Sequence, residues 1–201
     1  MRFALLRGLA LTVALSSVVL ATRSGHATGG ATTSASLHEA SAQPSKVFPV
    51  ARSDWYSVIN FSDDWLAPRM RLIGGEWRQV GVHEGNDIFA EPGTPVRAVT
   101  GGVLERVGWL FYSGWRVGLR GDDGRYWFYA HLSESPEHLA EGQRVEAGDR
   151  IGSVGNTGYG ERPGHRDEFV AHLHVGVQRP SGEWVNPYPL MKRLYEDAVD
   201  Q

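Results

Sequence analysis

The fold is decided by the stretch Val170-Ala171-His172-Leu173-His174-Val175-Gly176-Val177. Apolar residues recur at every second position along it, a pattern that predicts a strand with one buried face. His172 and His174 then share the opposite face with their side chains about 7 Å apart, whereas on a helix they would diverge by about 200°. Gly176 follows on that face and leaves space beside them. The stretch therefore predicts a sheet that carries two adjacent histidines.

A second group of candidate metal ligands lies upstream, in His83-Glu84-Gly85-Asn86-Asp87. In an extended strand His83 and Asp87 would lie about 13 Å apart, too far to share a metal ion, but Gly85-Asn86 is a sequence that bends the chain. Imidazole and carboxylate are both zinc ligands, and two histidines with one aspartate leave the fourth tetrahedral position for water. A His-x-x-x-Asp spacing is a weak signal when it stands alone.

The composition excludes several other kinds of site. The 201 residues include no cysteine, which rules out a disulfide scaffold, a thiolate zinc finger, a cysteine nucleophile and an N-terminal lipid-anchored cysteine. A formal net charge of −3 lacks the basic excess of nucleic-acid-binding proteins, so we expect no nucleic-acid partner. The chain has eight histidines, and any zinc would be bound by nitrogen and oxygen alone.

The middle of the chain reads as short strands and turns. Segments 115–119 and 125–130 flank Gly121-Asp122-Asp123-Gly124, a turn sequence that predicts a β-hairpin. Only residues 136–140 and 190–199 have a helical pattern. Turn signals about every 8 to 12 residues with little helix predict a mostly β fold, an antiparallel β-sheet sandwich or open barrel with short helices.

The first residues read as a targeting segment. An apolar run over residues 8–21 follows a short basic segment and is too short to span a bilayer. We predict a signal peptide over residues 1–27, cleaved after Ala21 or Ala27, which would leave no stable membrane span. The protein is then exported, to a periplasm or to the extracellular space and cell wall.

The remaining boundaries follow from composition. Residues 28–46 are rich in small and polar residues and are expected to form a disordered linker. We place the folded domain at residues 47–191 and a C-terminal tail at residues 192–201.

A third histidine, His131, ends the aromatic segment 127–133 and would by itself be read as structural. Together with the other two groups it resembles the lysostaphin/LytM-type zinc endopeptidases, over roughly residues 66–188. The motifs that carry the resemblance occur in order: Arg69, residues 83–87 running into 88–96, then 129–132, 142–145, 148–149, 151–158 and 172–174.

The resemblance implies a role for each of these residues. His83, Asp87 and His174 would bind zinc, and His131 and His172 would be the catalytic pair, one accepting the proton of the attacking water and the other stabilising the oxyanion. It also implies a fold similar to a duplicated hybrid motif and a substrate in the peptide part of bacterial peptidoglycan. The roles of His131 and His172 are not distinguished at this stage.

Two features leave alternatives open. Residues 159–170 lengthen the connection before His172 with many charged residues; the insertion either reshapes substrate choice or is a solvated loop, and we favour the solvated loop. The main alternative to an enzyme is a catalytically silent relative that binds the cell wall or regulates other wall hydrolases, and a regulatory protein partner is left open. We favour catalysis because every motif position is filled.

Overall fold

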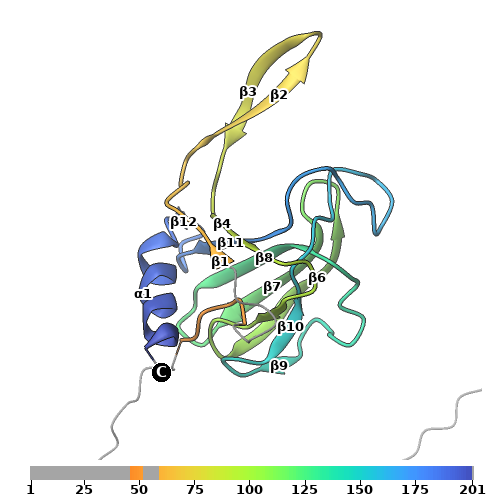
Figure 1. Cartoon of the computed structure of the whole chain (residues 1–201). Coiled ribbons are helices and arrows are strands. Elements are labelled where there is room, and N and C mark those ends of the chain that lie inside the picture. The colour runs from red at the N-terminus through yellow and green to blue at the C-terminus, as the bar shows by residue number, and fades with distance from the viewer. Residues whose placement is uncertain (1–45, 52–58, 201) are drawn as a thin grey trace, which may run out of the picture. The chain divides into compact units, whose positions relative to one another are not determined.

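A computed structural model of the protein describes residues 46–51 and 59–200 (Figure 1). The signal peptide predicted over residues 1–27 lies outside the described residues, as does the predicted linker apart from Lys46. None of the helical residues within the described ranges forms a segment long and apolar enough to cross a membrane.

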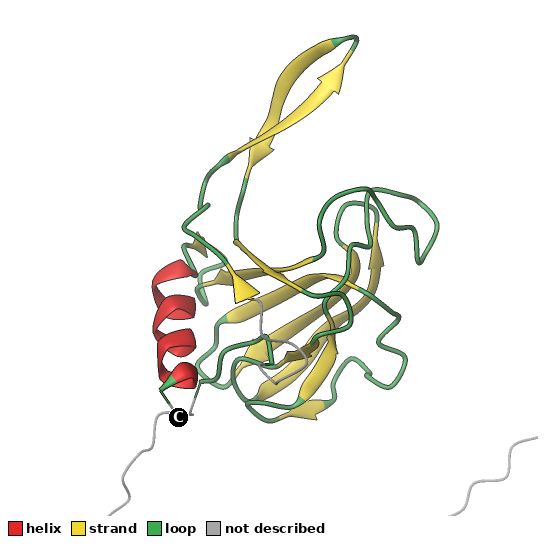
Figure 2. Cartoon of the chain, in the orientation of Figure 1, coloured by secondary structure: helices red, strands yellow, loops and turns green. Residues whose placement is uncertain are grey.

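The described residues form antiparallel strands with one helix at the C-terminal end (Figure 2). An eight-stranded sheet is the main element, and its strand order is not the chain order. Along the sheet lie β1 (Ile59–Asn60), β4 (Asn86–Ala90), β11 (His172–Gln178), β8 (Tyr126–Leu132), β7 (Gly114–Gly121), β6 (Gly102–Leu110) and β9 (Arg144–Val145), with β12 (Trp184–Val185) paired to β11. The predicted mostly β, antiparallel fold is confirmed.

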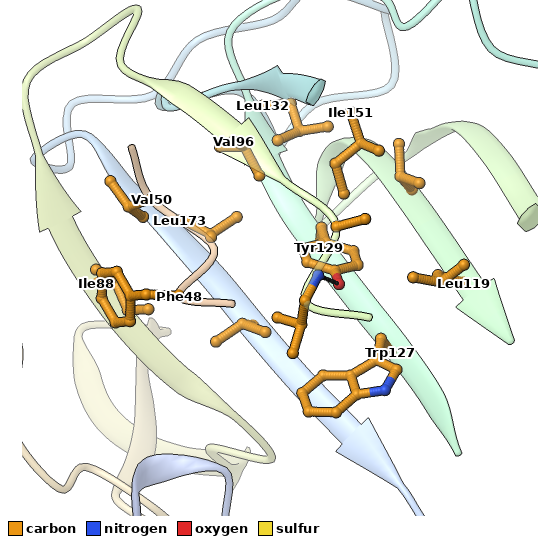
Figure 3. Packing of buried hydrophobic residues seen from close by; sticks show 14 of the residues in the cluster. Phe48, Val50, Ile88, Val96, Leu119, Trp127, Tyr129, Leu132, Ile151 and Leu173 are labelled. Carbon is orange, nitrogen blue, oxygen red and sulfur yellow. Dashed lines mark hydrogen bonds between the residues drawn. The ribbon is translucent and has the colours of Figure 1, made fainter. Parts of the chain in front are cut away.

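The core lies on one face of this sheet. A two-stranded sheet formed by β5 (Pro95–Arg97) and β10 (Arg150–Ser153) contributes to the same apolar cluster. Leu173 and Val175 of β11 and Trp127 and Tyr129 of β8 are fully buried, as the alternation in the sequence predicts. Figure 3 shows Leu173, Trp127 and Tyr129 on the central strands within the apolar cluster.

The helical predictions have different outcomes. Helix α1 (Tyr188–Val199) forms where residues 190–199 predicted it, and its apolar residues Met191 and Leu194 join the core. The helix predicted over residues 136–140 is wrong: this segment is a single turn closed by the Leu139 N–H donating to the Pro136 carbonyl. A five-residue segment forms too few intrahelical hydrogen bonds to offset the cost of helix nucleation.

A long hairpin that the sequence analysis does not predict stands apart from the core. Strands β2 (Pro68–Ile73) and β3 (Glu76–Val82) pair with each other and are mostly exposed. Gly74 and Gly75 join them with φ of 62° and 84°, the left-handed conformation that two-residue hairpin turns require. Figure 1 shows the hairpin projecting from the end of the main sheet that carries β4 and β11.

Replacing Leu173 by alanine tests the two-faced strand. Leu173 has no exposed surface and lies between His172 and His174, so truncation leaves a cavity in the core and we expect a loss of about 2 to 5 kcal/mol in the free energy of unfolding. Urea denaturation followed by tryptophan fluorescence measures it. Val103→Ala is the control, because Val103 is 38% exposed on β6. Equal losses in both variants would contradict the assignment of faces.

Candidate metal centre

Strand pairing brings three of the predicted site residues to one face of the sheet. On β11, His174 lies opposite Asp87 of β4 on one side and Ala130 of β8 on the other. Residues that face each other across antiparallel strands point to the same side of the sheet. Because Leu173 points into the core, His172, His174 and Asp87 share the opposite face.

His83 reaches the same place because the chain bends before β4. Residues 83–85 leave the extended conformation between β3 and β4, which confirms the bend predicted at Gly85-Asn86. A Cβ atom at Gly85 would overlap the imidazole ring of His174, so this close approach requires glycine. At Gly176 a Cβ would come within 2.7 Å of the Trp184 ring, so this glycine admits an indole rather than leaving free space.

Three donor atoms converge at this point. His83 Nε2 lies 2.8 Å from His174 Nδ1 and 3.0 Å from Asp87 Oδ1, and His174 Nδ1 lies 2.9 Å from that same oxygen. Neutral imidazole nitrogens and a carboxylate oxygen all present lone pairs, which repel one another unless a proton or a cation lies between them. Two histidines and one aspartate are also a donor set of catalytic zinc sites. The three residues therefore fit a metal ion.

Asp64 supports His83 from behind, and the sequence analysis missed it. The Nδ1–H of His83 donates to the Asp64 carboxylate and to its backbone carbonyl, both at 3.1 Å. The other carboxylate oxygen of Asp64 accepts a hydrogen bond from Asn86 at 2.7 Å. Such a carboxylate fixes the ring of a metal-binding histidine and turns its free nitrogen toward the metal. Asp64 lies in an irregular segment far from the motifs, where only its residue type could have suggested a role.

The charges at the centre favour a cation. Although burial lowers the pKa of His83, hydrogen bonds to Asp64 and Asp87 raise it to about 9. Burial would raise the pKa of Asp87, but hydrogen bonds from His174 and His83 hold it well below its usual value. Burial lowers the pKa of His174. The centre thus holds one ionised carboxylate among imidazoles, and in the metal-free protein a proton on His83 supplies the positive charge.

His131 joins the site through a β-bulge. In a regular strand His131 would point to the same side as Tyr129, into the core. Between Tyr129 and Leu132, β8 contains one more residue than the facing segment of β7, and His131 adopts a φ of 61°. Bulges of this kind redirect a side chain. His131 therefore faces the metal centre, with its ring centroid 4.8 Å from that of His172.

The two imidazoles beside the centre are held in the same way. His131 Nδ1 donates to the Thr157 carbonyl at 2.7 Å, and His172 Nδ1 donates to the Val170 carbonyl at 2.8 Å. The Nε2 of His172 lies 3.7 Å from Asp87 Oδ2, and both His131 and His172 are 8% exposed. Burial, together with the neighbouring His172 and His174, lowers the pKa of His131 to about 3. His131 is therefore neutral at ordinary pH and able to accept a proton.

A cleft of about 380 Å³ opens onto the centre. Its walls come from the sheet and from loops on either side, among them Phe128, Ser113, Trp184, Tyr112 and Tyr159. Arg69 of the hairpin also lines it and donates to Asp87 Oδ2 at 3.2 Å. His83, His131 and His174 line the cleft, so a chain bound in it would lie beside these three predicted site residues.

Comparison with known proteins agrees with this metal centre on an antiparallel sheet. Residues 81–187 match the model of peptidase family M23, and the chain belongs to that family. The resemblance to lysostaphin/LytM-type enzymes is thereby confirmed.

Individual relatives extend the comparison. The chain is 44% identical over 128 residues to an L-Ala–D-Glu endopeptidase of Bacillus subtilis, a match that covers 61% of this chain and 39% of the relative. It is 36% identical over 145 residues to the glycyl-glycine endopeptidase ALE-1 of Staphylococcus capitis, with 66% and 36% covered. The crystal structure of a LytM protein from Ruminococcus gnavus superposes with a TM-score of 0.62 at 36% identity, with 76% of this chain and 61% of that one covered. The chain thus spans less than half of either curated relative.

Asp64→Asn tests the support of His83. The amide cannot accept the Nδ1–H of His83 through its nitrogen, so we expect the dissociation constant for Zn²⁺ to rise about 10- to 100-fold while the fold persists. Competition with a chromophoric chelator measures the affinity. The control is Asp63→Asn, the neighbouring carboxylate, which bonds to Asn186 instead. An unchanged affinity in Asp64→Asn would remove Asp64 from the site.

The buried neutral state of His131 predicts a pH dependence of stability. A pKa of about 3 in the folded state lies below the value of about 6.5 in the unfolded chain, so the unfolded state binds more protons as pH falls below 6.5. Between pH 6.5 and 4.5 we expect the free energy of unfolding of the metal-free wild-type protein to fall. This fall should be about 2 to 3 kcal/mol larger than that of metal-free His131→Gln. Urea denaturation in the presence of EDTA measures both; parallel pH profiles would contradict the prediction.

Proposed function

We propose that this protein is a zinc-dependent endopeptidase that hydrolyses peptide bonds in peptidoglycan stem peptides or cross-bridges. The observation that carries the proposal is the convergence of His83 Nε2, Asp87 Oδ1 and His174 Nδ1 within 3.0 Å beside two further buried imidazoles. A structural metal site has no need of His131 and His172, two buried imidazoles outside the three-residue cluster, of which His131 lines the cleft. The substrate class is supported by the family resemblance and by the endopeptidase names of the relatives.

In this proposal His83, Asp87 and His174 would hold a zinc ion, which when bound would lower the pKa of a water molecule and polarise the scissile carbonyl. His131, held neutral by burial and oriented by its Nδ1–H donating to the Thr157 carbonyl, accepts the proton of the attacking water at Nε2. His172, whose Nε2 lies 3.7 Å from Asp87 Oδ2, contacts the oxygen of the scissile carbonyl, on which negative charge develops. The cleft orients the peptide and limits access of bulk water.

The location follows from the substrate. Peptidoglycan lies outside the cytoplasmic membrane, so the protein acts in a periplasm or in the cell wall, in agreement with the signal peptide predicted over residues 1–27. The competing function, a catalytically silent wall-binding or regulatory protein, would not need His131 to be redirected by a bulge. We therefore regard a wall-binding or regulatory function as the second candidate.

Separating metal binding from turnover tests the roles. Asp87→Ala removes a ligand and is expected to lose zinc and activity together, whereas His131→Ala keeps stoichiometric zinc and loses about 10²- to 10⁴-fold in kcat. Metal analysis and mass mapping of muropeptides from digested walls measure both and identify the bond cleaved. Glu91→Ala, an exposed carboxylate after β4, is the control.

The outcomes distinguish the alternatives. A purified wild-type protein that binds zinc but releases no peptide from any wall preparation would support the silent relative. A wild type without stoichiometric zinc, with activity that resists chelation, would contradict the zinc endopeptidase. Loss of metal in both Asp87→Ala and His131→Ala would overturn the assignment of His131.

A further inference from the structure

The insertion over residues 159–170 brings an aromatic ring to the two free imidazoles. Its charged side chains are mostly exposed, in agreement with a solvated loop, but Phe169 near its end is half-buried. The Phe169 ring centroid lies 4.9 Å from that of His131 and 5.2 Å from that of His172. The solvated-loop interpretation accounts for the charges and leaves this contact unexplained.

The backbone on both sides of Phe169 is fixed by hydrogen bonds. Before it, the side-chain amide of Asn156 donates to the Asp167 carbonyl at 2.9 Å, and the Asp167 N–H donates back to the Asn156 carbonyl at 3.1 Å. After it, the Val170 carbonyl accepts the Nδ1–H of His172. Phe169 is thus held between a loop anchor and one of the imidazoles that it touches.

Arg166 adds a second anchor to the insertion. Its guanidinium donates to the Ser133 carbonyl at 2.7 Å and to the Asn156 side-chain oxygen at 3.1 Å. Ser133 follows β8 two residues after His131. The insertion is therefore tied to the strand that carries His131 and, through Val170, to His172.

The two imidazoles need such a contact. A single hydrogen bond from Nδ1 fixes one atom of each ring and leaves the plane of the ring free to turn about that bond. The rings of Phe169, His131 and His172 meet at 56° to 64°, edge to face, which blocks this rotation. The His172 ring also contacts Phe89, with 5.3 Å between the ring centroids.

We propose that Phe169 is a positioning residue that sets the orientation of His131 and His172, so that the insertion is a working part of the catalytic site. The inference rests on the proposed endopeptidase function. It differs from a role in metal binding, because Phe169 contacts the two imidazoles that the proposal leaves free of metal. A ring orientation error of about 1 Å at the reacting atoms is enough to cost about 100-fold in rate.

Substitution at position 169 tests this in the zinc-loaded full chain. We expect Phe169→Ala to lower kcat about 10- to 100-fold with KM within about twofold and zinc content unchanged. Phe169→Tyr keeps the ring and restores most of the rate, whereas Phe169→Leu, which keeps an apolar anchor for the loop without the ring face, remains slow. Glu161→Ala is the matched control, because Glu161 lies in the same insertion with an exposed side chain.

NMR of the imidazole Cε1–H groups gives a readout that does not depend on activity. In Phe169→Ala the signals of His131 and His172 shift while those of His83 and His174 stay in place. Unshifted His131 and His172 signals, or a Phe169→Leu variant as fast as wild type, would overturn the proposal, as would loss of zinc in Phe169→Ala. Inactivity of the wild type would instead contradict the endopeptidase function, and the NMR result would still decide the role of Phe169.

Discussion

The site depends on holding three lone-pair atoms within 3.0 Å of one another. Such an arrangement is unfavourable without a positive charge between the atoms, so the rest of the structure must prevent them from moving apart. The register of β4 against β11 fixes Asp87 opposite His174. The bend at Gly85 allows His83 to approach, and Asp64 prevents its ring from turning away. The strand register thus positions Asp87 and His174, and the bend and Asp64 together position His83.

Strand β11 links the geometry of the three ligand atoms to the stability of the fold. The alternation that buries Leu173 and Val175 also presents His172 and His174 on the other face, so a shift of register by one residue would exchange core and site. Burial of apolar side chains on the core face therefore supplies the free energy that keeps the polar face in register. Gly85 and Gly176 pack so closely against the rings of His174 and Trp184 that a Cβ atom at either position would overlap them.

The parts of the site that follow strand alternation could be predicted from the sequence, and those that break it could not. His172, His174 and the bend between His83 and Asp87 follow from period-two patterning and a Gly-Asn turn. His131 contradicts alternation, because only the bulge redirects it, and the family resemblance alone identified it. Asp64, the Gly74-Gly75 hairpin and Phe169 depend on tertiary contacts; of these, only the glycine pair had a local signal, the preference of such pairs for hairpin turns.

The β2–β3 hairpin and the insertion over residues 159–170 bury little surface but still act on the chemistry of the metal centre. Arg69, on the exposed hairpin, pairs with Asp87 Oδ2 at 3.2 Å, while Asp87 Oδ1 faces His83 and His174. On the other side, the insertion carries Phe169 to His131 and His172. The sheet thus holds the donor atoms, while the hairpin contacts the ligand Asp87 and the insertion contacts His131 and His172. Sequence changes in the insertion can therefore alter the reaction without disturbing the metal-binding set.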